Sequence, residues 1–171
     1  FHYRLRRQLQ LCISDRGMAF ADSLIAEYDA SVLIVDRYHQ PGGHWTKSYP
    51  FVRLHQPSAF YGVNSVALGE NQIDAAGWNK GLYELAGKGE ITAYFDRVMK
   101  QKFLMSGRVK YFPSCEYLGK GMFKSLISGK QYFVSYSKFV DSTFMDVVVP
   151  AMREPPFRIG ENLSLIHISE P

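Results

Sequence analysis

Two hydrophobic patterns with different periods open the recognisable part of the chain. Between Arg16 and Tyr28, apolar residues recur at three- and four-residue steps, which predicts a helix. A continuous apolar run follows at Val32 to Val35 and is typical of a strand buried on both faces of a parallel sheet. Helical spacing returns over residues 91–103, and residues 109–112 predict a second parallel strand. The apolar face of the first helix consists of Met18, Ala21, Leu24, Ile25 and Tyr28.

The second half of the sequence is rich in predicted strands. Turn signals occupy residues 119–129, alternation over 131–140 predicts a strand pair or a bent strand, and 145–149 is another apolar strand. We expect residues 32–36, 109–112 and 145–149 to lie in one sheet, with the first two strands parallel and the first helix packed on one face. The order of elements predicts an α/β fold, with a mostly parallel sheet and a β-hairpin insertion.

A long segment without sustained periodicity, residues 37–75, separates the first strand from the second helix. It is rich in Gly, Pro, His and Asn, and it also carries many aromatic residues. Loops of this length are usually functional or disordered. The aromatic content argues against disorder. We therefore expect a functional loop.

Composition narrows the class of protein. The 171 residues are 46% hydrophobic and 15% aromatic, enough for one domain with a buried core. No apolar run reaches the length of a transmembrane helix, and the basic N-terminus lacks the pattern of a signal peptide. The net charge of +4 comes from scattered residues, so we expect neither a nucleic-acid nor a membrane partner. Two distant cysteines, Cys12 and Cys115, indicate free thiols in a reducing compartment and favour a cytoplasmic location.

A dinucleotide-binding fingerprint partly matches the start of the first helix. The pattern G-x-G-x-x-G is followed by an acid about 20 residues on. Gly17 fits the third glycine, and Asp36 lies 19 residues later at the end of the predicted strand. The first two glycine positions hold Cys12 and Ser14. A side chain at the second position would push the pyrophosphate away from the backbone, so we expect weakened cofactor binding.

The residues after this strand resemble a known family. The stretch from Asp36 to Trp45, with Gly42-Gly43, is similar to the acid-x5-Gly-Gly-x-Trp segment of FAD-dependent oxidoreductases. The nearest group is the flavin-containing and Baeyer–Villiger monooxygenases and their relatives with two dinucleotide domains. Tyr49-Pro50 and the stretch 54–57 resemble that family's tyrosine-proline and leucine-x-x-proline loop. The resemblance covers residues 17–150 in element order, and its specific motifs lie in 17–57.

This resemblance implies a Rossmann-like FAD-binding domain and a role for each matching residue. Asp36 would hold the adenosine ribose, and the Gly42-Gly43 backbone would lie along the cofactor. The loop at Leu54 would lie near the flavin, and a strand over 109–118 would bring the Cys115 backbone to the adenine edge. In complete relatives NAD(P)H reduces the flavin. The implied cofactor-binding residues are Cys12, Ser14, Gly17, Asp36, Arg37, Gly42, Gly43, Trp45, Leu54 and Cys115.

Other interpretations of the same residues remain open. Asp36 could be a solvated acid at a strand end and Trp45 a core aromatic residue, in a non-catalytic α/β binding or interaction module that has lost its cofactor. Three loop histidines lack a carboxylate or cysteine at zinc-ligand spacing, so we expect no metal site. An RNA-binding module would need a clustered basic patch, which the sequence does not contain. No residue is assigned as catalytic, and the substrate stays unknown.

The domain limits follow from these patterns. We leave residues 1–11 unassigned as a candidate non-native start, assign 12–157 to a partial FAD-binding domain, and treat 158–171 as a tail. Residues 164–171 resemble translated sequencing adapter and are set aside as an artefact. The chain does not begin with Met and shows no second Gly-rich fingerprint. We therefore expect a fragment that is inactive alone.

Overall fold

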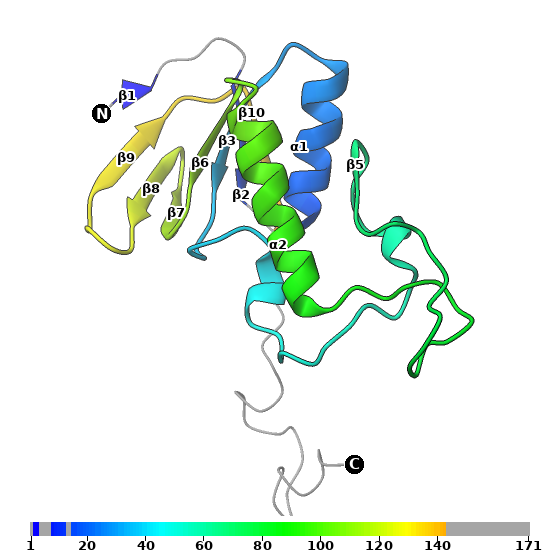
Figure 1. Cartoon of the computed structure of the whole chain (residues 1–171). Helices are drawn as coiled ribbons and strands as arrows, with labels where there is room; N and C mark the ends of the chain where they lie inside the picture. Colours follow the sequence, from blue (N-terminus) through cyan, green and yellow to red (C-terminus); the bar gives the residue numbers. More distant parts are fainter. Residues whose placement is uncertain (1, 4–7, 13–14, 143–171) are drawn as a thin grey trace, which may run out of the picture.

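A four-stranded parallel sheet forms the centre of the molecule (Figure 1). The computed structural model describes residues 2–3, 8–12 and 15–142. The sheet has the strand order β10-β2-β3-β6, and each neighbouring pair is parallel. Renumbered along the chain, this is the order 4-1-2-3, which from the other edge reads 3-2-1-4 and matches the first four strands of the dinucleotide-binding fold. The strands are β2 (Gln8–Cys12), β3 (Ser31–Val35), β6 (Val109–Phe112) and β10 (Lys138–Asp141).

One β-α-β unit sets this topology. Helix α1 (Asp15–Glu27) connects β2 to β3, which pair in parallel with Cys12 opposite Val35. Parallel strands need such a crossover, and the right-handed crossover places the helix against one face of the sheet. The apolar stripe of α1 is buried there: Met18 and Ala21 are fully buried and Ile25 nearly so. The predicted helix and the predicted parallel pairing of 32–36 with 109–112 are confirmed.

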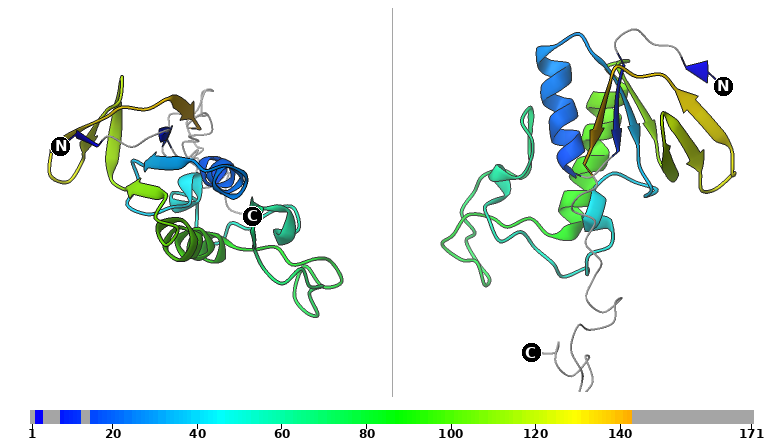
Figure 2. Two further views of the ribbon diagram at one scale, coloured as in Figure 1. Left: turned by 90° about the horizontal axis from the view of Figure 1, so that it is seen from above. Right: turned by 180° about the vertical axis from the view of Figure 1, so that it is seen from behind.

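The parallel sheet is covered differently on its two faces (Figure 2). On one face, α1 and α2 (Lys88–Val98) pack against Val32 and Ile34, together with the following π-helical turn (Met99–Leu104). On the other face, Leu33 and Val35 pack against an antiparallel sheet. The continuous apolar run of β3 is therefore explained, because alternate side chains enter two separate cores.

The antiparallel part of the second sheet, strands β7 to β9, lies between β6 and β10 in the chain. The N-terminal strand β1 adds to it by pairing with β9 in parallel, which gives the sheet the order β1-β9-β8-β7. Phe123 is fully buried at its centre and contacts the rings of Phe112 and Tyr132. The alternation predicted over 131–140 resolves into two strands that lie in different sheets. The strands are β1 (His2–Tyr3), β7 (Cys115–Gly119), β8 (Met122–Ser125) and β9 (Gln131–Val134).

Some expectations from the sequence need correction, and others concern residues that the structure does not describe. Residues 1–11, left unassigned, contain most of β2, a central strand of the parallel sheet. The single strand expected over 109–118 is wrong, because the chain turns at Ser114, where φ is 50°, and β7 then begins in the other sheet. The turn region 119–129 holds strand β8. The strand expected at 145–149 and the tail 158–171 lie outside the described residues.

The long segment between β3 and α2 is ordered by side-chain contacts more than by regular structure. It contains two short 3₁₀ turns, Gly43–Thr46 and Ser58–Phe60, and the small hairpin of β4 (Gly62–Val63) and β5 (Val66–Ala67). Tyr94 of α2 holds this hairpin: its hydroxyl donates to Val66 O (2.6 Å) and accepts from Val63 N (2.8 Å). None of the described helices is long and apolar enough to cross a membrane.

Gly62 is the position in this hairpin where only glycine fits. Its φ is +113°, and a Cβ there would collide with the Tyr94 ring. We expect Gly62→Ala to lower the free energy of unfolding by about 1–3 kcal/mol in urea denaturation, because a strained backbone costs about that much. Gly89→Ala, in α2 with open space around its Cβ position, is the matched control and should stabilise by up to about 1 kcal/mol. Equal effects of the two substitutions would contradict this explanation.

Candidate functional site

The carboxyl ends of the parallel strands form the edge where ligands bind in folds of this topology. From β2 the chain adds β3 and then β6 on one side of the sheet, and later adds β10 on the other side, so the strand order reverses between β2 and β10. At this point Cys12 of β2 pairs with Val35 of β3 and with Asp141 of β10. Asp36 follows directly after β3 at this edge. Its backbone N–H donates to Phe112 O (3.0 Å), which fixes it against β6. The predicted acid therefore stands where a ribose-binding acid stands in a dinucleotide fold.

The Asp36 carboxyl group is buried and incompletely paired. The residue is 2% exposed, and its Oδ1 accepts a hydrogen bond from Tyr38 N (3.0 Å). Oδ2 and the neighbouring Tyr111 hydroxyl are both buried, and neither completes a hydrogen bond of normal geometry. Buried polar atoms are rarely left so, because the lost solvation costs about 1–3 kcal/mol. This pair of orphaned atoms is the chemically distinctive feature of the edge.

Burial governs the ionisation of both groups. Desolvation raises the pKa of Asp36 to about 7, although the Tyr38 N–H and the Tyr111 hydroxyl favour the charged form. Burial, reinforced by the nearby Asp36 charge, raises the pKa of Tyr111 above its usual range. Near neutral pH the Asp36 carboxyl group is therefore poised between its neutral and charged forms. A hydroxyl donor placed at Oδ2 would favour the charged form.

Tyr111 is a site residue that the sequence analysis missed. Tyr111 lies in β6 and pairs with Ile34 of β3. Asp36 comes two positions after Ile34, so Tyr111 and Asp36 lie on the same face of the sheet. The predicted parallel pairing of 32–36 with 109–112 contained the signal. Side chains alternate between faces along a strand, so the register places a polar tip beside the acid. Residues 109–112 were predicted only as a strand, without asking which residue of it shares a face with Asp36.

The glycine pair adopts conformations that favour glycine. Gly42 has φ +124° and Gly43 has φ +52°. A Cβ at Gly42 would meet Thr92 of α2 at ordinary contact distance, so the backbone torsion, more than space, selects glycine there. Both residues are buried, and Gly42 O accepts a hydrogen bond from Trp45 N (3.0 Å). The pair forms a tight turn that brings the loop after β3 against α2.

Trp45 and Leu54 belong to the main hydrophobic core. Trp45 is 6% exposed, and its Nε1 donates to the Tyr61 hydroxyl (2.6 Å). Leu54 is 5% exposed, and its N–H donates to Ala86 O (2.9 Å). Both side chains have core partners on the helical face of the sheet. Their packing is explained without a cofactor.

The remaining predicted residues are placed as follows. Gly17 is buried in the first turn of α1, and Cys12 ends β2, whereas Ser14 lies outside the described residues. Arg37 is exposed and lies 3.8 Å from Glu116. The Cys115 backbone N–H donates to Asp36 O (2.8 Å), so an adenine contact would need a different backbone atom. Burial raises the pKa of the Cys115 thiol, which argues against a nucleophilic role.

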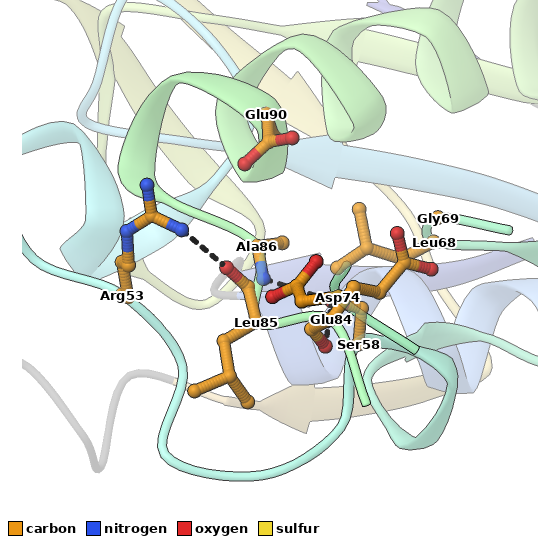
Figure 3. A pocket seen from close by; sticks show the side chains of 9 residues that line it. All are labelled: Arg53, Ser58, Leu68, Gly69, Asp74, Glu84, Leu85, Ala86 and Glu90. Carbon is orange, nitrogen blue, oxygen red and sulfur yellow. Dashed lines mark hydrogen bonds between the residues drawn. The ribbon is translucent and has the colours of Figure 1, made fainter. Parts of the chain in front are cut away.

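A pocket of about 180 Å³ lies elsewhere, lined by residues of the long segment between β3 and α2 and by Glu90 in the first turn of α2 (Figure 3). None of the predicted site residues lines it. Its acids are committed to the local fold: Glu90 Oε2 accepts from Gly87 N (2.7 Å), and Glu84 accepts from two backbone N–H groups. Within the described part of the chain, no three His, Cys, Asp or Glu residues are grouped to hold a metal ion. The lining residues are Arg53, Ser58, Leu68, Gly69, Asp74, Glu84, Leu85, Ala86 and Glu90.

Comparison with known proteins extends this description at the level of the fold. No family model matches the sequence. The chain is 55% identical over 155 residues to the uncharacterized protein Rv2000 of Mycobacterium tuberculosis and to the uncharacterized protein Mb2023 of Mycobacterium bovis. These matches cover 90% of the chain but only 29% of each relative. The chain therefore spans less than a third of the length of these relatives.

Solved structures with a similar fold include a flavin-containing monooxygenase from Stenotrophomonas maltophilia. The match has a TM-score of 0.51 and 14% identity, and covers 80% of this chain and 38% of that protein. A double mutant of the flavin monooxygenase from the same organism matches equally well. The expected α/β class with a Rossmann-type parallel sheet is confirmed. At this identity the likeness shows the fold and leaves the cofactor to be inferred.

Proposed function

We propose that this chain is the FAD-binding part of an NAD(P)H-dependent flavin oxidoreductase or monooxygenase. The observation that carries the proposal is the unpaired, buried Asp36 Oδ2 at the carboxyl end of β3, in a 4-1-2-3 parallel sheet. An acid at this place accepts hydrogen bonds from a ribose hydroxyl in dinucleotide-binding folds. The fold of flavin-containing monooxygenases supports the same inference. The proposed domain covers residues 12–157 together with the rest of β2, which begins at Gln8. Cys115 as a buried free thiol is consistent with a cytoplasmic location.

The residues present fit the adenosine end of FAD best. Asp36 Oδ2 offers the acceptor, and the Tyr111 hydroxyl lies beside that carboxyl group. The Gly42-Gly43 turn holds the following loop close to α2. Helix α1 begins just after β2, and the N-terminus of a helix in this position is where a pyrophosphate binds in dinucleotide folds. When bound, FAD supplies reversible redox chemistry, and the protein contributes position and electrostatics. Cys12 and Ser14 at the two missing glycine positions weaken this binding.

The competing function is a non-catalytic α/β binding or interaction module that has lost its cofactor. One observation favours it: Asp36 is 2% exposed, so a ribose would have to displace part of its cover. The non-glycine residues Cys12 and Ser14 point the same way. Purification with excess FAD, followed by gel filtration and a visible absorbance spectrum, separates the two. Weak but saturable binding supports the flavoprotein proposal, and no binding at any concentration supports the module.

Restoring the two glycines tests the site directly. We expect Cys12→Gly with Ser14→Gly to tighten FAD binding about 5- to 150-fold, because special backbone positions cost about 1–3 kcal/mol when occupied by other residues. Fluorescence titration of FAD measures the Kd. Ser128→Gly, at the exposed tip between β8 and β9, is the matched control and should leave the Kd unchanged. A stoichiometric yellow protein from the unaltered chain would refute the expected weakness of the native site.

A further inference from the structure

A projecting segment exposes large apolar side chains. Residues 69–85, here called the arm, extend away from the sheet and helices between β5 and α2 (Figure 1). Trp78 is fully exposed, Leu82 is 64% exposed, Ile73 59% and Tyr83 48%. Single exposed apolar residues are ordinary, but four large ones within one short projecting segment are the kind of feature that interaction sites show.

The arm is held in shape by its own hydrogen bonds. Ile73 and Tyr83 form an antiparallel bridge, Asp74 N donates to Leu82 O (2.9 Å), and Gly81 N donates to Asp74 O (2.9 Å). The Asn79 side-chain amide donates to Asp74 Oδ2 (2.8 Å) and to Tyr83 O (2.6 Å). The apolar side chains are therefore presented on a preorganised scaffold, which lowers the entropic cost of binding.

The base of the arm is fixed to the body of the domain. Glu84 Oε1 accepts from the backbone N–H groups of Glu70 and Asn71, both at 2.6 Å. The buried Ser58 hydroxyl donates to Glu84 O (2.9 Å) and accepts from Ala86 N (2.8 Å). Figure 3 shows Ser58, Glu84 and Ala86 together at this junction. The orientation of the arm relative to the domain is thus set before any partner arrives.

We propose that the arm docks onto an apolar protein surface in the remainder of a longer polypeptide to which this domain belongs. The relatives are matched over only 29% of their length, and the similar monooxygenase over 38%, so in both cases most of the polypeptide lies outside the matched part. Trp and Tyr dominate the binding energy of protein interfaces, and the arm carries one of each. The occupant would present an apolar pocket for Trp78 with a hydrogen-bond acceptor for its indole N–H.

The charges on the arm argue against a lipid surface. The arm, residues 69–85, carries more acidic than basic side chains: the acids are Glu70, Asp74 and Glu84, and the single cation is Lys80. Anionic membrane surfaces attract basic segments and repel acidic ones. A protein surface therefore fits the arm better than a bilayer does.

Hydroxyl-radical footprinting with peptide mass analysis tests the docking without changing a residue. The chain alone is compared with a chimera in which it replaces the matched 155 residues of the Mycobacterium tuberculosis relative. Oxidation of Trp78, Leu82 and Tyr83 should fall about fivefold or more in the chimera, because interface cores are shielded from solvent. Met122 and Phe133, exposed on the antiparallel sheet, are the internal controls and should not change.

Two results would overturn the proposal. One is equal oxidation of the arm in the chain alone and in the chimera. The other is protection of the arm in the chain alone, together with a dimer in sedimentation, which would make a second copy the occupant. If the chimera does not fold, footprinting of the unaltered relative decides: the segment aligned with 73–83 must be protected, and its oxidation at the rate of exposed segments refutes the docking.

Discussion

Lys102→Met is expected to destabilise the protein by about 1–3 kcal/mol, because it removes the counter-charge of the buried Asp22 carboxylate and leaves it with the hydrogen bonds from Ser65. Asp22 of α1 is 1% exposed, and its Oδ1 lies 2.8 Å from Lys102 Nζ in the π-helical turn after α2. Ser65 donates to the same carboxylate through its hydroxyl (2.6 Å) and its backbone N–H (3.0 Å). Since domains are stable by only about 5–15 kcal/mol, urea denaturation should show a large loss.

Lys100→Met is the matched control for this prediction. Lys100 pairs with Asp96 at 2.8 Å, but both side chains are exposed, so the loss should be about 0.5 kcal/mol or less. Adding Asp22→Asn to Lys102→Met should recover part of the lost stability, because it removes the unpaired charge. Similar losses from Lys102→Met and Lys100→Met would contradict the importance of the buried pair.

The same pair predicts how stability falls in acid. Burial alone would raise the pKa of Asp22, but the hydrogen bonds from Lys102 and Ser65 outweigh it and hold the pKa below its ordinary value of 3.8. A carboxylate with a lowered native pKa contributes stability above its unfolded pKa. That contribution is lost as the pH falls below about 4 toward the native pKa.

Asp36→Asn is expected to stabilise the cofactor-free protein at pH 8 by about 2 kcal/mol or more. The unfolded carboxyl group ionises near 3.8, whereas burial raises the native pKa of Asp36 to about 7. Ionising it in the folded state therefore costs roughly 4 kcal/mol, and wild-type stability should fall from pH 4 to pH 7 and then level off. The asparagine keeps the acceptor for Tyr38 N–H and removes the charge. Thermal denaturation across this pH range measures the difference.

The same substitution should weaken FAD binding about tenfold or more, because a hydrogen bond to a charged group is worth about 1.5–3 kcal/mol. FAD affinity of the unaltered chain should rise with pH up to about 7, as the carboxylate forms, and the asparagine variant should lose this dependence. Asp29→Asn, at an exposed position after α1, is the control for both measurements. If Asp36→Asn left the FAD affinity unchanged, Asp36 would not bind the ribose. If the same variant were less stable than the unaltered protein at pH 8, the raised pKa of Asp36 would be contradicted.

Much of the fold could be predicted because local periodicity reports burial. The three- and four-residue steps of α1 and α2 and the continuous apolar run of β3 correspond to the faces they bury. Strand β2 stayed unassigned, although its sequence, Gln8–Cys12, alternates polar and apolar residues as a strand does. Its central place in the parallel sheet comes from pairing with β3 and β10, and a five-residue alternation does not show which strands it pairs with.

The features of the candidate site were likewise predictable from the sequence only in part. The sequence by itself determined the acid after β3 and the glycine turn, because the end of a buried strand and a positive φ each select particular residue types. Only the tertiary structure decided that Asp36 is covered, that Tyr111 faces it, and that Trp45 belongs to the core. Burial and pairing depend on which distant strands and helices pack together, and the residues of one segment do not encode that alone.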